Sequence, residues 1–252
     1  GALVRCSIPQ VVTVHDLGYL AEPAAHPART RQMLDLTTRW NARVARQLIV
    51  ISGQTRDDLV EHYGTTPDKV TVIHSGVDHK RFRVLDGGVV REVTTRLGID
   101  RPYIFFLSTV QPRKNLVRLI EAFELLDDDM LLVIGGATGW LGHPIEEGIE
   151  RSRAAARIRR LGPVAADDVP ALYNGARVFA LPSLYEGFGM GVLEAMAWGC
   201  PVVTSNRSSL PEVAGDAAVL VDPLDVASIR DALLRASTSP ERGRLIEAGL
   251  QR

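Results

Sequence analysis

The chain has 252 residues, 46% of them hydrophobic, and a formal net charge of −1 at pH 7. This length can bury a sizeable core in one large domain or two small ones, and the near-neutral charge does not indicate nucleic acid as a partner. Because no apolar run approaches the ~20 residues that span a bilayer and no signal peptide is visible, we expect a cytoplasmic protein. Cys6 and Cys200 each lie beside apolar residues, which favours buried free thiols in a reducing compartment.

The first third of the chain predicts a small set of buried strands. Short apolar runs place them at residues 10–14, 48–51 and 70–73. Residues 85–90, which contain two glycines, form the predicted linker and divide the chain into domains 1–85 and 86–252. A complete α/β domain usually needs more than these three strands. We therefore expect residues 1–85 to be the second half of an N-terminally truncated domain.

Residues 29–46 predict an amphipathic helix. Apolar side chains recur there at spacings of three and four, at Met33, Leu36, Trp40 and Val44. The other side carries Arg29, Arg31, Arg39, Arg43 and Arg46. Two interpretations stay open: a solvated basic face with the apolar stripe in the core, or contact with an anionic surface at the inner face of a membrane. We favour the first because Asp35 dilutes the positive charge.

After the predicted linker, strands alternate with helices. The strands are expected at residues 103–107, 130–134, 158–161, 177–181, 202–203 and 218–221. The helices are expected at residues 113–126, 144–155, 166–174, 226–237 and 241–251, with a further one that begins near residue 190. This alternation predicts an α/β fold with a parallel, doubly wound sheet.

The most informative stretch is residues 183–203, SLYEGFGMGVLEAMAWGCPVV. It follows a predicted strand, and Gly187, Gly189 and Gly191 mark a loop that turns tightly or lets a ligand approach. A helix begins near Met190 and stops at Gly199. The loop therefore lies at the carboxyl end of a strand and at a helix N-terminus, which is where open α/β sheets bind ligands.

Two carboxylates flank this loop. Glu186 opens it, and Glu194 lies on the helix among apolar neighbours. Glu186 could simply complement the helix dipole, and Glu194 could be an ordinary surface residue. However, a carboxylate on a largely buried helix needs hydrogen-bond donors, and sugar hydroxyls are suitable donors.

A basic pair follows an earlier predicted strand. Arg113 and Lys114 come after the turn that contains Thr109 and are expected to open a helix. Cations at the start of a helix oppose its dipole, which suggests a functional reason such as phosphate binding, although two exposed bases remain the alternative. Gly135, at the next strand end, either lines the same cleft or forms a plain turn.

Glu-Gly-Phe-Gly, then Leu-Glu-Ala-Met-Ala and Gly-Cys-Pro-Val-Val, resembles the signature of the retaining nucleotide-sugar glycosyltransferases of family 4, the group 1 glycosyltransferases. The resemblance covers nearly the whole chain. It implies the GT-B architecture of two Rossmann-like domains, of which the N-terminal one is incomplete here. Two departures are Gly191, where many members have proline, and Ser108, where some have arginine.

The resemblance also implies roles for particular residues. Glu186, with Gly187, Phe188 and Gly189, would lie by the donor sugar, and Glu194 would bind the ribose. Arg113 and Lys114 would hold the donor phosphates beside Thr109, and Val164 would pack the base together with Tyr173. His15 would face the donor sugar from the N-terminal domain, although a loop histidine with a local partner is an equal reading. Both acids and the basic pair are thus expected to converge on one crevice.

The implied activity is retaining transfer of a hexose, with mannose from GDP-mannose as the first choice of donor and a UDP-sugar as an alternative. The acceptor would be a glycan or a lipid-linked sugar, as in polysaccharide biosynthesis. A sugar-nucleotide epimerase and a non-catalytic nucleotide-sugar-binding fragment are the other readings. No cofactor and no metal are expected, because the histidines are scattered, no Asp-x-Asp pair is expected at a strand end and no Walker motif is present. The three aspartates at residues 127–129 lie between a predicted helix and a predicted strand and are interpreted as a solvated turn.

Overall fold

The computed structural model describes residues 8–78, 84–126 and 129–252. Its first sheet has the order β1-β2-β3 and is parallel throughout. The strands are β1 (Val11–Val14), β2 (Gln47–Val50) and β3 (Val70–Val72). The three predicted strands are confirmed, each within a residue or two of its expected ends.

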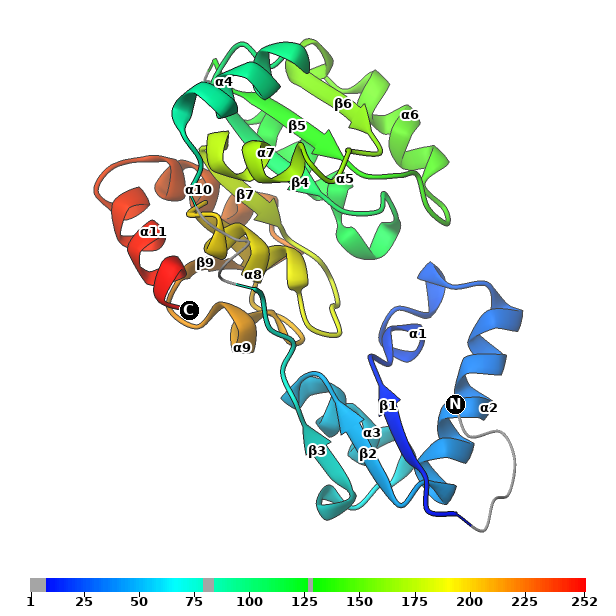
Figure 1. The fold of residues 1–252 in the computed structure, drawn as a ribbon. Helices are drawn as coiled ribbons and strands as arrows, with labels where there is room; N and C mark the ends of the chain where they lie inside the picture. Colours follow the sequence, from blue (N-terminus) through cyan, green and yellow to red (C-terminus); the bar gives the residue numbers. More distant parts are fainter. Residues whose placement is uncertain (1–7, 79–83, 127–128) are drawn as a thin grey trace.

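Helices connect these strands (Figure 1). They are α1 (Gly18–Ala21), α2 (Ala28–Val44) and α3 (Gly53–Tyr63), with 3-10 turns η1 (Pro23–Ala25) and η2 (Pro67–Lys69). The sequence sets the ends of α3: the Ser52 hydroxyl accepts a hydrogen bond from the Thr55 amide at 3.1 Å, and Gly64 closes the helix with φ of 63°. This fixes the α3 N-terminus directly after β2.

The helix over residues 29–46 is confirmed as α2, but the prediction for its apolar stripe is wrong. Met33 and Leu36 are 58% and 66% exposed. The buried side chains of α2 are instead Thr38, Asn41 and Ala42. The buried side of α2 is therefore formed by small and polar side chains together with the partly buried Leu34, because the helix is rotated away from the orientation that its hydrophobic spacing favours.

The second sheet has the order β6-β5-β4-β7-β8-β9, again parallel throughout. Its strands are β4 (Tyr103–Leu107), β5 (Leu131–Gly135), β6 (Ile158–Gly162), β7 (Val178–Leu181), β8 (Val202–Ser205) and β9 (Ala218–Val221). The chain runs outward from β4 to β6 and then returns to build β7 to β9 on the other side of β4. The carboxyl ends of β4 and β7 therefore form the switch point, where sheets of this kind bind ligands.

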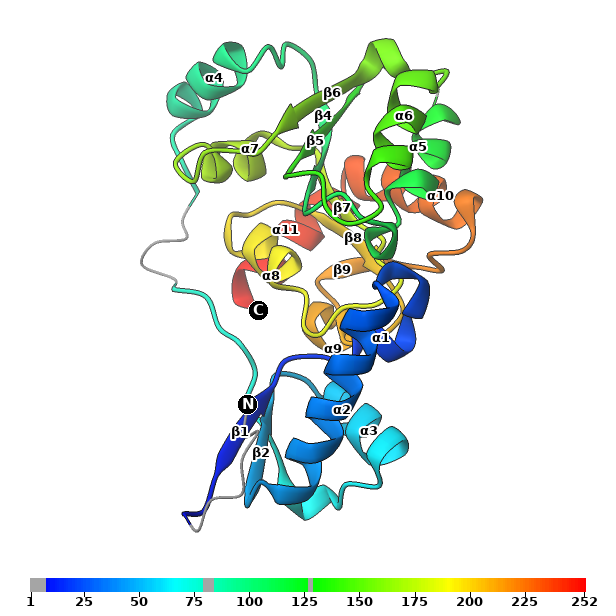
Figure 2. The ribbon, with the colours of Figure 1, turned by 90° about the vertical axis from the view of Figure 1, so that its right-hand side faces the viewer.

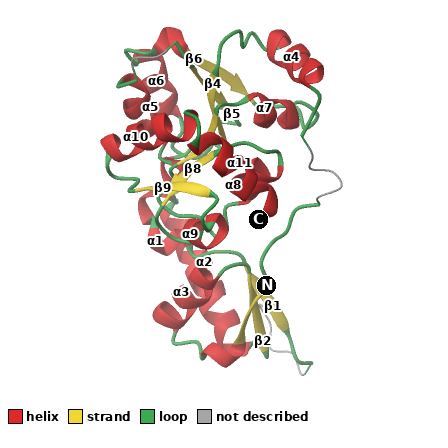
Figure 3. Cartoon of the chain, turned by 90° about the vertical axis from the view of Figure 1, so that its left-hand side faces the viewer, coloured by secondary structure: helices red, strands yellow, loops and turns green. Residues whose placement is uncertain are grey.

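Helices cover both faces of this sheet. They are α4 (Gly87–Arg96), α5 (Leu116–Glu124), α6 (His143–Arg151), α7 (Val169–Gly175), α8 (Met190–Ala197), α9 (Leu210–Ala214), α10 (Val226–Ser237) and α11 (Glu241–Gln251). Two 3-10 turns are η3 (Pro112–Lys114) and η4 (Ala155–Arg157). Figures 2 and 3 show α5, α6 and α10 on one face and α4, α7, α8 and α11 on the other. The predicted doubly wound α/β sheet is confirmed.

The predicted linker over residues 85–90 is wrong for most of its length. The Asp86 side chain accepts a hydrogen bond from the Gly88 amide at 2.7 Å and caps α4, so residues 87–90 are helical despite their two glycines. The two sheets lie on either side of residues 85 and 86, and the domain boundary at that position stays a prediction. Within the described ranges, no helix combines the length and the apolar content that a membrane span needs.

Candidate functional site

The loops that follow β4 and β7 are joined at the switch point. β4 and β7 are neighbouring parallel strands that pair at Ile104 with Val178, so their carboxyl ends lie at the same edge of the sheet. Beyond the strands, the Leu184 amide donates to the Arg113 carbonyl oxygen at 2.9 Å. The Asn115 side-chain amide donates to the Pro182 carbonyl oxygen at 3.0 Å. Hydrogen bonds thus join two segments far apart in the sequence into one site at the strand ends.

The basic pair lies in the 3-10 turn η3 and not at the start of an α-helix. Asn115 has φ of 58°, in the left-handed region, and this turn delays the helix until Leu116. The expected helix over residues 113–126 is therefore wrong at its first turn. Arg113 and Lys114 project from the turn toward the β7 loop, and the conflict with a helix dipole that motivated their selection does not arise.

Glu186 is the shared partner of both cations. Its Oε1 lies 2.6 Å from Lys114 Nζ, and its Oε2 lies 3.1 Å from Arg113 Nη1. The Ser183 hydroxyl donates to Glu186 Oε1 at 2.7 Å. The side chains of Glu186, Lys114 and Arg113 are only 9%, 12% and 16% exposed. The cluster formed by these three side chains, which we call the basic cluster, holds two positive charges against one negative charge.

Burial and charge act in opposite directions on the pKa of Glu186. Burial favours the neutral acid, but the charges of Lys114 and Arg113 outweigh it and hold the pKa of Glu186 below its usual range. Burial lowers the pKa of Lys114, against the opposing pull of Glu186. Glu186 is therefore an ionised hydrogen-bond acceptor at neutral pH. In this state it suits the orientation of hydroxyl groups and not the donation of a proton.

Two serines that sequence reasoning did not select as site residues hold the loop after Glu186. The Ser208 hydroxyl donates to the Glu186 carbonyl oxygen at 2.5 Å. The Ser209 hydroxyl lies 2.8 Å from the carbonyl oxygens of both Glu186 and Phe188. Ser209 is fully buried, and a buried hydroxyl needs hydrogen-bond partners, but this burial is a property of the fold that the sequence does not show.

Gly187 is required by space. A Cβ at this position would lie 2.6 Å from the His15 carbonyl oxygen and 2.7 Å from Asp16 Cβ. The loop between β7 and α8, which we call the signature loop, therefore packs against the end of β1. The predicted site residue His15 lies beside this loop, and the His15 side chain is exposed. Gly189, with φ of 109°, turns the chain into α8.

A second group of predicted residues lies at the ends of β4, β5 and β6. A Cβ on Gly135 would lie 2.8 Å from Val164 Cγ2, and Gly139 packs closely on the Thr109 side chain. The Val110 amide donates to the Ala137 carbonyl oxygen at 2.8 Å. Thr109, Gly135 and Val164 are thus neighbours through these loops.

Glu194 lies on α8, half-buried, beside the hydroxyl of Tyr173. Tyr173 is fully buried, and burial first and the charge of Glu194 second raise the pKa of its hydroxyl. The ion pairs described for Arg113 and Lys114 are both to Glu186. The structure therefore brings Glu186 and the basic pair into contact, whereas the neighbour described for Glu194 is Tyr173. The expected convergence of both acids on one crevice stays a prediction.

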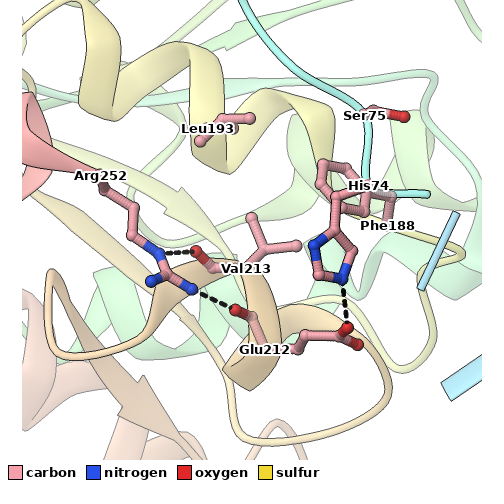
Figure 4. Close-up of a pocket in the computed structure, with 7 residues that line it drawn as sticks. All are labelled: His74, Ser75, Phe188, Leu193, Glu212, Val213 and Arg252. Atoms are coloured by element: carbon pink, nitrogen blue, oxygen red, sulfur yellow. Dashed lines mark hydrogen bonds and ion pairs between the residues drawn. The ribbon is translucent and has the colours of Figure 1, made fainter. Parts of the chain in front are cut away.

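A hollow of about 350 Å³ lies on the α8 side of the signature loop (Figure 4). Phe188 and Leu193 line it from the signature stretch, and His74, Glu212 and Arg252 line it from elsewhere. The His74 imidazole lies 2.6 Å from Glu212 Oε1, and that carboxylate also accepts from the Gly53 amide at the start of α3. Sequence reasoning did not select His74, Glu212 or Arg252. Among the described residues, no group of acidic, histidine and cysteine side chains has the arrangement of a metal site.

Two family profiles match the chain over most of its length. The profile "Glycosyl transferases group 1" matches residues 93–252, and "Glycosyltransferase Family 4" matches residues 1–81. The chain belongs to the group 1 glycosyltransferases. The resemblance drawn from Glu186, Glu194 and their neighbours is thereby confirmed at the level of the family.

Curated relatives are about 30% identical to the chain in sequence. An O-antigen chain mannosyltransferase B from Escherichia coli is 30% identical over 230 residues, which are 90% of this chain and 60% of the relative. A D-inositol 3-phosphate glycosyltransferase from Salinispora tropica is 32% identical over an alignment of 278 positions, gaps included, which covers 98% of this chain and 56% of the relative. The chain thus spans less than two thirds of the length of these relatives.

Solved structures confirm the GT-B fold. HepE from Anabaena, solved in complex with UDP and glucose, has a TM-score of 0.83 and 21% identity, and the match covers 96% of this chain and 66% of that chain. WaaG, a glycosyltransferase involved in lipopolysaccharide biosynthesis, has a TM-score of 0.77 and 19% identity, covering 97% and 70%. At these identities the likeness concerns the fold alone.

Proposed function

We propose that the chain binds a nucleotide-sugar donor and takes part in retaining, metal-independent transfer of its hexose to a glycan or lipid-linked hydroxyl. The observation that carries this proposal is the basic cluster at the switch point. Arg113 and Lys114 bring two positive charges to a buried site and Glu186 brings one negative charge, so the cluster has an excess of positive charge. A diphosphate is the anion that such a strand-end site suits.

The hydrogen bonding of the cations leaves capacity for phosphate. In the described residues, Arg113 uses Nη1 for Glu186 and for the Tyr185 carbonyl oxygen, and Lys114 donates to Glu186. A guanidinium has five N–H donors and an ammonium has three. Both cations can therefore bind the diphosphate while Glu186 stays in place, and they would stabilise its charge as it leaves.

Roles for the two acids follow from their surroundings. Glu186 would accept hydrogen bonds from sugar hydroxyls next to the diphosphate, because it is ionised and directly adjacent to both cations. Glu194 would accept from the ribose, with Val164 and Gly135 against the base and Thr109 beside the phosphates. The name of the mannosyltransferase relative supports mannose as the transferred sugar, and we propose GDP-mannose as its donor. The UDP and glucose bound to HepE support a UDP-sugar as the alternative.

A thermal-shift series tests the donor. A bound donor stabilises the folded chain by mass action, so about 100 times the Kd of the matching nucleotide sugar adds roughly 2.7 kcal/mol. We expect GDP-mannose to raise the Tm more than UDP-glucose or ADP-glucose at equal concentration. If none of the three raises it, the proposal is wrong.

Product analysis then separates transfer from the other readings. Transfer requires an acceptor, whereas an epimerase converts the donor without one. A chain that is stabilised by the donor but forms no product with or without acceptor acts as a non-catalytic binding fragment. We keep this alternative because the chain spans less than two thirds of the length of its relatives.

Contact with a membrane belongs to the same proposal. Met33 and Leu36 are exposed on α2 together with Arg39 and Arg43, so one surface offers apolar and cationic groups. We expect the chain to sediment with phosphatidylglycerol vesicles and not with phosphatidylcholine vesicles. Substitution of Met33 and Leu36 by serine should abolish this sedimentation, and no sedimentation of the unsubstituted chain would contradict the contact.

A further inference from the structure

Tyr185 inserts its side chain from the β7 loop between two helices of the first sheet. Its hydroxyl donates to Asp58 Oδ2 at 2.7 Å and lies 3.3 Å from the Leu17 amide, which donates to it. A Cβ on Gly18 would lie 3.4 Å from the Tyr185 ring, so the ring packs on α1. Tyr185 is 5% exposed.

The acceptor of this hydrogen bond is held on the other side as well. Asp58 lies on α3, is 8% exposed, and its Oδ1 accepts from the Gln54 side chain at 2.7 Å. A buried carboxylate that loses a donor is left with unmet hydrogen-bonding capacity, so the pair has a strong preference for its present geometry. The contact joins positions separated by 127 residues.

The backbone of Tyr185 belongs to the basic cluster. Its carbonyl oxygen accepts from Arg113 Nη1 at 2.6 Å, and the next residue is Glu186. One residue thus has its side chain fixed on α1 and α3 and its main chain fixed on the phosphate-facing cations. Tyr185 thus connects α3 directly to Arg113 and to the residue next to Glu186.

We propose that Tyr185 is a positioning residue, which holds the Glu186 loop and the basic pair in register with the α1 and α3 segment through Asp58. This inference rests on the proposed function, because the Glu186 loop and the basic pair are the groups that we propose to bind the donor. Tyr185 acts through Glu186 and Arg113 and is not itself assigned to the reacting atoms.

The first experiment measures the register without activity. Spin labels on Glu61→Cys in α3 and Glu247→Cys in α11 report the distance between the helices of the first sheet and those of the second. Both positions are exposed, so both can be labelled. A Cys6→Ser background removes one native thiol, and Cys200 is 2% exposed with its pKa raised to about 12 by burial, so it resists labelling. We expect Tyr185→Phe to broaden the distance distribution.

Tyr63→Phe is the matched control. Tyr63 donates to Asp35 at the same 2.7 Å, but both residues belong to the first sheet and its helices. This variant also loses a tyrosine–aspartate hydrogen bond, and we expect it to leave the distance distribution unchanged. A Tyr185→Phe distribution that matches the unsubstituted chain overturns the proposal.

The second experiment measures transfer in the same variants. Loss of positioning lowers kcat by about 10-fold for Tyr185→Phe and changes the donor KM less than about 3-fold, whereas Tyr63→Phe stays within about 2-fold in both. Asp58→Ala should match Tyr185→Phe, and the double variant should add little to either. An unchanged kcat in Tyr185→Phe overturns the proposal. If the unsubstituted chain transfers no hexose, the proposed function fails, and the distance measurement still decides the role of Tyr185.

Discussion

Lys114 Nζ lies 2.6 Å from Glu186 Oε1, and both side chains are almost completely buried. The pair joins the loop after β4 to the loop after β7 at the switch point of the second sheet. Because Arg113 contacts the same carboxylate, removal of Glu186 leaves two buried cations that repel each other, and removal of Lys114 still leaves an ion pair. The two substitutions should therefore have opposite effects on anion binding.

We predict that Glu186→Gln binds GDP at least as tightly as the unsubstituted chain, while Lys114→Met binds it about 100-fold more weakly. The amide no longer competes for the cations, whereas the methionine removes one charge-assisted contact worth roughly 1.5–3 kcal/mol. Isothermal titration with GDP measures both. Lys69→Met is the control, since the Lys69 ammonium contacts the carbonyl oxygens of Ala42 and Arg43 in the first half of the chain. Weaker GDP binding by Glu186→Gln would mean that Glu186 does not oppose the diphosphate.

The ribose assignment of Glu194 gives a separate prediction. Glu194→Ala should weaken GDP binding about 10- to 100-fold, because hydrogen bonds to a charged acceptor contribute roughly 1.5–3 kcal/mol. Glu150→Ala removes an exposed carboxylate from α6 and should leave the Kd unchanged. The same titration checks both variants. Equal affinities for the two would exclude ribose binding by Glu194 and leave it as a neighbour of Tyr173.

The sequence predicted the sheet well because its strands are buried on both faces. Residues 103–107 and 131–135 are continuous apolar runs, and the structure places β4 and β5 there. Short elements escaped prediction because local contacts decide them. Asn115 in the left-handed region shortens α5, and the cap from Asp86 turns a glycine-containing segment into α4. Neither the turn at Asn115 nor the cap from Asp86 can be recognised from hydrophobic periodicity.

The site was predictable only in part for a related reason. Glu186 was selected because its loop lies at a strand end and at a helix N-terminus. The basic pair was selected because cations were expected to oppose a helix dipole, a reason that the 3-10 turn η3 removes. Tyr185 with Asp58 could not be found this way, since nothing local indicates a contact across 127 residues. The exposure of Met33 and Leu36 could not be predicted either. Hydrophobic spacing shows that apolar side chains share one side of a helix, but it does not show whether another part of the protein packs on that side.

The pair of Glu146 and Arg160 predicts a pH-dependent part of the stability. Arg160 Nη2 lies 2.7 Å from Glu146 Oε1, and the Thr138 hydroxyl also donates to that oxygen. The hydrogen bonds from Arg160 are the largest cause that lowers the pKa of Glu146. A lowered folded-state pKa gives stability that is present above the unfolded pKa of about 4.3 and is lost as the pH falls through the folded value.

Glu146→Gln should therefore lower the free energy of unfolding by about 1 kcal/mol at pH 7 and by less below about pH 4. Urea denaturation at both pH values measures the difference. The control is Glu147→Gln, because Glu147 and its partner Arg151 are 61% and 74% exposed and such pairs contribute little. An equal loss at both pH values would show that packing and not charge accounts for the effect.

Gly187 and Gly148 give a prediction about space. A Cβ at Gly187 would meet the His15 carbonyl oxygen at 2.6 Å, which is main chain and cannot rotate away, whereas a Cβ at Gly148 on α6 would meet nothing within 4 Å. Gly187→Ala should therefore push the signature loop away from β1 and lower transfer by about 10-fold or more. Gly148→Ala should leave transfer unchanged and stabilise α6 by roughly 0.5–1 kcal/mol, about 1–4 °C in Tm. Transfer assays and thermal denaturation of both variants check this. Full activity of Gly187→Ala would show that the loop tolerates separation from the end of β1 and that this contact does not set the geometry of the site.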